Sequence, residues 1–299
     1  MSYIYKVSSN IVSTFFEIPF LKEHKLSSRE TVNITAKMDQ NLDCSNFLYS
    51  NQNKYTCNYR ISKIYIKDIA YFQIKNRGKE IRIKVLEKNY IHKNLFYSKF
   101  LNHIIPYALY MNGKLVLHAS GITNKNASFL FLGRSQSGKS SLSASLRDYN
   151  FLSEDSVLVN FKKNNLYSCG SFPYVKLNKN IALKLFFDIE DSIIVNGETF
   201  NRSLFKVNNY DDKIKKIHKC YILKWSNNFK ISKLSPKESL VELYASSFGP
   251  NPIDSCKESQ IYQFKQFMEF IKKIPIYLLE RNKKNLFNDN NKIIEHLNF

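Results

Sequence analysis

The sequence lacks long hydrophobic runs and regular cysteine patterns. No stretch of the 299 residues approaches the ~18–20 consecutive apolar residues of a bilayer-spanning helix. The first residues, Met1–Lys6, lack the pattern of a secretory signal. The cysteines form no C-x-x-C pair and lie near no histidine cluster, which argues against a zinc site and a disulfide framework; they are Cys44, Cys57, Cys169, Cys220 and Cys256. We therefore expect a cytoplasmic protein with reduced, mostly structural thiols and no membrane partner.

Acidic residues are also few. Asp and Glu number 25 against 45 Lys and Arg, which leaves a net charge of +20. Such a charge invites a nucleic-acid-binding interpretation. The lysines, however, are interleaved with Asn and Ile and form no dense basic block. We therefore favour a diffuse, solubilising surface over nucleic-acid binding, and an acidic protein or peptide would be steered to it equally well.

Apolar residues make up 43% of the chain, which is ample for a packed core in one large domain or two ordinary ones. The N-terminal third alternates between apolar and polar residues, as β-strands do. The turn at 75–79 is followed by Ile81, Ile83 and Val85 on one face, with charged residues between them, which predicts a hairpin. A mostly apolar segment, 94–110, is typical of a helix interrupted at Pro106.

The most informative stretch joins an apolar strand, Phe129–Leu132, to Gly133–Ser140, which reads G-x-x-x-x-G-K-S without a substitution. Leu142 and Leu146 then follow at helical spacing. The alternative is a chance Gly/Ser-rich turn, but strand, loop and helix are all present. The residues expected to bind the nucleotide are Gly133, Arg134, Ser135, Gln136, Ser137, Gly138, Lys139, Ser140 and Ser141.

These residue types suit a nucleotide polyphosphate. The two glycines let the backbone turn tightly, so that successive N–H groups face one concavity. Lys139 supplies a point charge for the β and γ oxygens, and the Ser140 hydroxyl is a hard oxygen ligand for Mg²⁺. ATP and Mg²⁺ are therefore the expected cofactors.

The flanks of this loop carry a family resemblance. Upstream, Asn112–Gly121 contains a strand ending in His-Ala-Ser, and downstream, Tyr149–Val159 contains a strand running into Ser-acid-acid. This arrangement resembles the catalytic domain of HPr kinase/phosphorylase, and more closely the broad group of HPr-kinase-like P-loop kinases. The resemblance extends from about residue 100 to the end. It implies an α/β fold, with an HPr-kinase-like P-loop core at 96–299 behind an N-terminal β-rich (α+β) domain at 1–95.

The acid pair Glu154-Asp155 follows a predicted strand, Tyr149–Leu152, where side chains of an α/β sheet project toward the ligand crevice. The resemblance implies that Glu154 is the general base and Asp155 the carboxylate on the metal side. In that family the pair is commonly Asp-Asp. The longer Glu154 would reach further, or the two roles could be exchanged; an exposed acidic turn is the other interpretation.

His118 and several cations complete the candidate site. A lone histidine on an apolar strand is more often a core residue, whereas the resemblance places His118 near the transferred phosphate, as an electrostatic or proton partner. Lys176, Lys179 and Arg202 are candidates for stabilising the phosphoryl charge, although a solvated face suits each of them. Segments 206–213 and 249–257 are predicted mobile loops that could close over an acceptor.

We expect an ATP-dependent kinase that phosphorylates a Ser or Thr hydroxyl of a protein or peptide. The resemblance makes a ribosomally made precursor peptide one plausible acceptor. Two alternatives stay open: a nucleotide-binding regulatory module without phosphoryl transfer, which the replacement of Asp by Glu154 keeps open, and a nucleic-acid-dependent NTPase. The sequence leaves the oligomeric state open.

Overall fold

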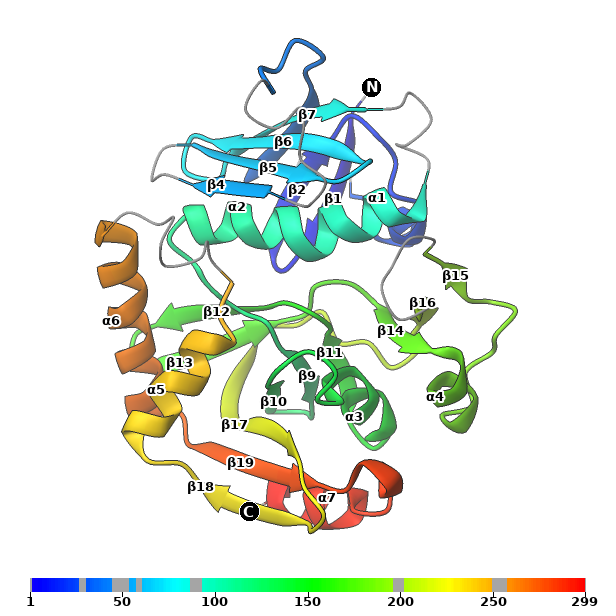
Figure 1. Cartoon of the computed structure of the whole chain (residues 1–299), viewed down its shortest axis with the longest axis vertical. Coiled ribbons are helices and arrows are strands. Elements are labelled where there is room, and N and C mark those ends of the chain that lie inside the picture. Colours follow the sequence, from blue (N-terminus) through cyan, green and yellow to red (C-terminus); the bar gives the residue numbers. More distant parts are fainter. Residues whose placement is uncertain are drawn as a thin grey trace. The chain divides into compact units, whose positions relative to one another are not determined.

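The chain has a mixed α/β fold, seen in a computed structural model that describes residues 2–26, 31–44, 54–57, 61–86, 93–195, 202–248 and 257–298 (Figure 1). Contacts between Cα atoms divide the chain into two units. Unit 1 comprises Met1–Lys114, Val195–Gly197 and Phe248–Gln263; unit 2 comprises Leu115–Ile194, Glu198–Ser247 and Phe264–Phe299. Residues 96–114, which the sequence assigned to the second domain, thus group with unit 1.

Unit 1 is built on a seven-stranded sheet in the order β1-β2-β3-β7-β6-β5-β4. The pairs β2-β3 and β3-β7 are parallel, and the other pairs are antiparallel. The strands are β1 (Tyr3–Val7), β2 (Asn10–Thr14), β3 (Ile34–Met38), β4 (Lys54–Cys57), β5 (Ser62–Ile66), β6 (Ala70–Lys75) and β7 (Glu80–Val85), and a short 3-10 helix, η1, spans Pro19–His24.

One long helical segment of unit 1 lies along this sheet in Figure 1. It consists of α1 (Asn94–Lys99), a π-helical turn η4 (Phe100–Ile104) and α2 (Ile105–Met111). Pro106 stands in the first turn of α2, where its missing N–H costs least, so the helix continues through the proline after a wide π turn. Phe96 stacks on Phe72 of the sheet, with ring centroids 6.0 Å apart, which packs the segment onto the strands.

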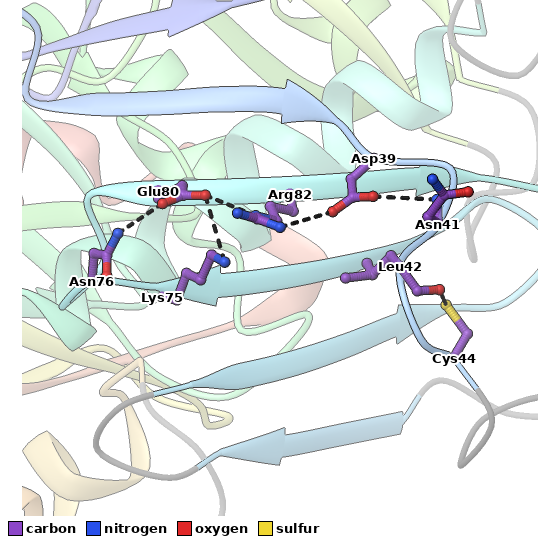
Figure 2. A network of polar contacts seen from close by, with 8 residues as sticks. All are labelled: Asp39, Asn41, Leu42, Cys44, Lys75, Asn76, Glu80 and Arg82. Carbon is purple, nitrogen blue, oxygen red and sulfur yellow. Dashed lines mark hydrogen bonds and ion pairs between the residues drawn. The ribbon is translucent and has the colours of Figure 1, made fainter.

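The predicted hairpin is confirmed as β6 and β7. Ile81 and Ile83 are buried completely, while the alternate positions face a polar network that Figure 2 shows. Arg82 bridges Glu80 at 2.8 Å and Asp39 at 3.1 Å, and the hydrogen bond from Arg82 lowers the pKa of Glu80. This network ties the end of β3 to the hairpin on its polar face.

Unit 2 contains a nine-stranded sheet with the path β11-β9-β10-β17-β13-β12-β8, and β19 joins β17 to β18. The neighbours β10, β17 and β19 are mutually parallel, so their carboxyl ends meet at one edge. The strands are β8 (Leu115–Leu117), β9 (Ser120–Thr123), β10 (Ala127–Leu132), β11 (Asn150–Ser153), β12 (Val157–Lys162), β13 (Asn165–Cys169), β17 (Lys215–Trp225), β18 (Lys230–Lys233) and β19 (Ile276–Arg281).

A three-stranded sheet in the order β14-β16-β15 also belongs to unit 2. Its strands are β14 (Tyr174–Asn178), β15 (Ile193–Ile194) and β16 (Arg202–Lys206). The helices after residue 115 are α3 (Lys139–Ser145), α4 (Lys179–Lys184), α5 (Pro236–Ala245), α6 (Lys257–Lys273), the 3-10 turn η5 (Lys283–Asn285) and α7 (Asn290–Asn298).

Strand β10 shows how the core of unit 2 is arranged. Phe129 and Phe131 point into a cluster that includes Leu142 of α3 and residues of α7. Leu130 and Leu132 point the other way, into a cluster with residues of α5 and α6. Both faces of the parallel strands are therefore covered by helices, which explains why β10 is a continuous apolar run.

Three further expectations can be compared with these elements. In the sequence, Phe264, Phe267, Met268 and Ile271 stand at helical spacing, which predicts a packed helix over 261–271. The helix is confirmed within α6, but Phe264 is 49% exposed because Phe267 and Phe270 take the buried face. Cys44, Cys169 and Cys220 are buried free thiols, as expected. Among the described residues, no helix has both the length and the apolar character needed to cross a bilayer.

Candidate functional site

The loop with the phosphate-binding motif lies between β10 and α3, so strand, loop and helix follow one another as predicted. Its backbone is left-handed at Gln136 and at Gly138, which has a φ of 85°, and Gly133 has a φ of 132°. A Cβ atom at Gly133 would lie 2.8 Å from the carbonyl oxygen of Leu223. Both glycines are therefore required by conformation as well as by the motif.

Lys139 is folded back onto this loop. Its Nζ donates hydrogen bonds to the carbonyl oxygens of Gly133 at 2.8 Å and Arg134 at 3.2 Å, and the residue is only 7% exposed. Burial lowers the pKa of Lys139, and the negative charges of Asp155 and Glu154 oppose this shift. The ammonium thus rests on carbonyl oxygens that a bound phosphate could replace.

Glu154 connects α3, the helix that follows the loop, to β14 of the three-stranded sheet. The Ser140 hydroxyl donates to Oε1 of Glu154 at 2.8 Å, and the other carboxyl oxygen accepts a hydrogen bond from the backbone N–H of Lys176 in β14. Glu154 is buried, and burial, followed by the charge of Asp155, raises its pKa to about 8. The raised pKa favours the protonated side chain near neutral pH, while the charge of Lys176 and the hydrogen bonds from Ser140 and the Lys176 backbone favour the charged form.

Asp155 points in a different direction because its backbone is left-handed, with a φ of 59°. Its Oδ2 lies 3.3 Å from Nζ of Lys176, a buried lysine. Its carbonyl oxygen accepts a hydrogen bond of 2.9 Å from Nδ1 of His118. A carbonyl can only accept, so Nδ1 of His118 carries the hydrogen; burial also lowers the pKa of this ring, which favours its neutral form.

The structure brings most of the predicted site residues together. Gly133–Ser140, Glu154, Asp155 and His118 belong to one connected set of contacts. Arg134, Ser135 and Gln136 are exposed on the loop, Ser137 is buried, and Ser141 is partly buried in α3.

Among the three candidate cations, Lys176 contacts Asp155, and Arg202 lies close enough to lower the pKa of Lys139. Lys179 stands apart from these groups: it is exposed at the start of α4. Of the three candidates, Lys179 is the one whose exposure agrees with the interpretation as a solvated surface residue.

The two predicted loops have different outcomes. Segment 206–213 is held to β11, because the backbone N–H of Phe151 donates to Asn209 and the N–H of Asp211 donates back to Phe151, at 2.8 and 2.9 Å. The expectation of a freely moving loop is therefore not supported by its contacts. The other segment, 249–257, lies outside the described residues except at Lys257.

Two residues that contact the loop were missed by sequence reasoning. Trp225 and Arg281 are the last residues of β17 and β19, and they face each other in the parallel register. Nε1 of Trp225 donates to the carbonyl oxygen of Gln136 at 2.9 Å, and the guanidinium of Arg281 reaches Ser137 and Gly138. Each residue ends a largely apolar strand segment, which was the available signal, but the pairing of β17 with β10 and of β19 with β17 is a tertiary property.

The oxygen atoms at this site fit a magnesium ion. Mg²⁺ is typically held by one or two protein oxygens together with phosphate and water, and Ser140 Oγ and Glu154 Oε1 are already adjacent. Within the described parts of the chain, no cluster of three or more His, Cys, Asp or Glu side chains offers an all-protein metal cage. The donor set therefore suits a metal that arrives with a phosphate ligand.

The fold and the site together define an α/β protein in which a loop of phosphate-binding sequence lies beside two acids. Comparison with protein-family models and with curated proteins finds no match. Among solved structures, the chain is similar to the HPr(Ser) kinase/phosphatase from Coxiella burnetii, at 12% sequence identity and a TM-score of 0.34. The match covers 61% of this chain and 95% of that chain.

Proposed function

We propose that this protein is an ATP-dependent kinase that transfers the γ-phosphoryl group of Mg·ATP to a Ser or Thr hydroxyl of a protein or peptide. The observation that carries the proposal is the hydrogen bond of 2.8 Å between Ser140 and Glu154. It joins the loop that would hold the triphosphate to the acid pair that would serve the metal and the acceptor. Phosphoryl transfer needs those three functions at one place.

The loop residues bind the nucleotide in this proposal. Backbone N–H groups of the loop hold the β-phosphate, and Lys139 exchanges the carbonyl oxygens of Gly133 and Arg134 for phosphate oxygens. That exchange favours binding, because a buried ammonium gains more from an anion than from neutral carbonyl groups.

The roles of the two acids are exchanged relative to the sequence-based assignment. Glu154, not Asp155, contacts Ser140, so Ser140 and Glu154 would hold Mg²⁺. The metal supplies charge stabilisation for the β and γ oxygens. Its positive charge would also favour ionised Glu154, so metal binding should release a proton from this carboxyl group.

Asp155 is then the base that orients and deprotonates the acceptor. The acceptor oxygen bonds to the γ-phosphorus, its proton passes to Asp155, and the bond between the γ-phosphorus and the bridging oxygen breaks to leave ADP. Lys176, 3.3 Å from Asp155, can stabilise the charge of the transferred group. His118 acts through the backbone of Asp155, because its contact is to the carbonyl oxygen, and is a positioning residue.

One observation favours a second candidate, a nucleotide-binding regulatory module without phosphoryl transfer. Both acids already have partners within the protein: Glu154 with Ser140 and the backbone of Lys176, and Asp155 with the Lys176 ammonium. Partners that stay in place would keep the base from an acceptor. Binding without turnover would then be the outcome.

Transfer from γ-labelled ATP distinguishes the two candidates. Acceptors would include proteins co-purifying with the chain and precursor peptides rich in Ser and Thr. Asp155→Asn should keep nucleotide binding and lower turnover by about 10²–10⁴-fold, the usual contribution of a general base. Glu154→Gln should weaken Mg²⁺-dependent binding, and Lys139→Ala should abolish both binding and transfer.

Lys179→Ala serves as the matched control, because Lys179 is an exposed lysine of the same unit. It should retain the wild-type rate. Binding of Mg·ATP without turnover on any acceptor would support the regulatory module. Failure to bind ATP, GTP or pyrophosphate would contradict both candidates.

A further inference from the structure

Trp225 and Arg281 contact the phosphate-binding loop on the side of its carbonyl oxygens. They end two strands that are parallel to β10, so the sheet delivers both side chains to the edge where the loop begins. A Cβ atom at Gly138 would lie 2.8 Å from a guanidinium nitrogen of Arg281 and 2.9 Å from the indole of Trp225. The loop therefore rests directly on these two side chains.

Both side chains contact carbonyl oxygens of consecutive loop residues. Nε1 of Trp225 donates to Gln136, while Nη2 of Arg281 lies 3.3 Å from the oxygen of Ser137 and 3.5 Å from that of Gly138. In a trans peptide the C=O and the following N–H point in opposite directions. The Ser137 carbonyl oxygen held toward Arg281 thus turns the N–H group of Gly138 toward the other side, the concavity of the loop. The Gly138 carbonyl oxygen also accepts a hydrogen bond of 2.9 Å from the N–H of Leu142, so α3 and Arg281 together set the direction of the Lys139 N–H.

Arg281 is also an unusual buried charge. It is 2% exposed, and among the described residues its Nε and Nη1 atoms have no hydrogen-bond partner. Trp225 covers it with an indole ring 5.1 Å from the guanidinium carbon. Burial lowers the pKa of Arg281 to about 10, with the charge of Asp289 opposing the shift. A charge buried with unpaired donors destabilises the fold, and an anion bound by the loop would offset that cost.

We propose that Arg281 and Trp225 are positioning residues that orient the phosphate-binding loop from the side opposite its concavity, and that the buried positive charge of Arg281 favours a polyphosphate bound across the loop. This inference rests on the proposed function, because it assigns these residues to the same nucleotide site. It also predicts that Arg281 raises the affinity for phosphate groups and lowers the stability of the ligand-free fold. A residue that only packs would not show such opposite effects.

Arg281→Met tests this directly, because methionine fills similar space without the charge. Without ligand, its thermal midpoint should equal or exceed that of the wild type. Its affinity for Mg·ATP and for pyrophosphate should fall about ten- to a hundredfold, whereas affinity for adenosine should not change. Arg281→Lys should recover part of the affinity. Lys224→Met removes an exposed charge beside Trp225 and should leave binding unchanged.

Trp225 provides an independent readout because it is the only tryptophan in the sequence. Pyrophosphate should change its fluorescence in the wild type, and less so in Arg281→Met. Calorimetry on Trp225→Phe, which lacks the hydrogen bond to Gln136, should show weaker binding.

The outcomes separate the two proposals. A wild type that binds neither nucleotide nor pyrophosphate contradicts the proposed function itself. A wild type that binds, with Arg281→Met binding equally well, leaves the function standing and overturns this inference. Equal losses of affinity and thermal stability that Arg281→Lys does not rescue also overturn it. Should Arg281→Met not fold, Arg281→Lys and Trp225→Phe decide the question by calorimetry.

Discussion

At the scale of single residues, the side chains of Glu154 and Asp155 point in different directions because the backbone of Asp155 is left-handed. The left-handed conformation of Asp155 turns its side chain toward Lys176, while Glu154 extends toward Ser140. Glu154 is the more buried of the two, and its neighbours set its protonation. Two acids that differ in this way can serve two different tasks in one reaction.

The pKa of Glu154 predicts how the ligand-free protein responds to pH. Burial raises this pKa from 4.5 to about 8, so between those values the folded state holds a proton that the unfolded chain has lost. This contribution to stability is complete below about pH 4.5, declines as the pH rises and is lost above about pH 8. Urea unfolding at a series of pH values should therefore show a decline that Glu154→Gln lacks.

Glu190→Gln is the control for that series, because it removes an exposed carboxyl group from the same unit. It should keep the pH dependence of the wild type. A wild-type free energy of unfolding that does not fall between about pH 6 and about pH 9, relative to Glu154→Gln, would contradict the raised pKa.

At the scale of elements, helix α3 positions the site through its apolar face. Leu142 is fully buried among Phe129, Phe131 and other residues of one core cluster, directly after the loop. Ser143 of the same helix donates a hydrogen bond of 2.7 Å to the Ser120 hydroxyl of β9. The helix is therefore fixed to the sheet on which the loop depends.

Leu142→Ala should lower the free energy of unfolding by about 2–5 kcal/mol, because it removes buried methyl groups and leaves a cavity. Nucleotide affinity should fall with it, since α3 begins at Lys139. Denaturant unfolding and calorimetry measure the two effects. Val241→Ala on α5, where the valine is 61% exposed, should stay within about 0.5 kcal/mol of the wild type. Equal stabilities for the two variants would show that Leu142 does not anchor α3.

At the scale of the whole molecule, every residue assigned to the site belongs to unit 2. Unit 1 contributes a seven-stranded sheet, a helical segment and a surface polar network. The net charge of +20 belongs to the entire chain and attracts polyanions without selecting one. In the proposed function, selectivity for a nucleotide therefore comes from the loop and its partners.

Hydrogen exchange on the intact chain tests this division. Mg·ATP should slow amide exchange at 133–146 and 150–156, because a ligand protects the segments whose opening would release it. Strands β5, β6 and β7 of unit 1 should exchange at unchanged rates. Equal protection in those strands would contradict the assignment of the site to unit 2 alone.

Much of the fold and the site follows from patterns that are short in sequence. Alternation around the turn at 75–79 predicted β6 and β7, and the run at 129–146 predicted a strand, a loop and a helix, because these elements depend on neighbouring residues. The proximity of the acid pair to Ser140 was also expected, whereas which of the two acids meets Ser140 was left open by the sequence. The grouping of 96–114 with unit 1 and the exposure of Phe264 depend on packing partners that a local pattern does not contain.

The sequence alone determined that a tight, glycine-bearing loop follows an apolar strand, since torsion angles and side-chain periodicity are local properties. Only the tertiary structure decided which acid meets Ser140 and which side chains lie behind the loop. Arg281 contacts Ser137 across 144 positions of the chain because parallel strands bring their carboxyl ends to one edge. Strand order is set by the packing of the whole core, so that edge exists only in the folded molecule.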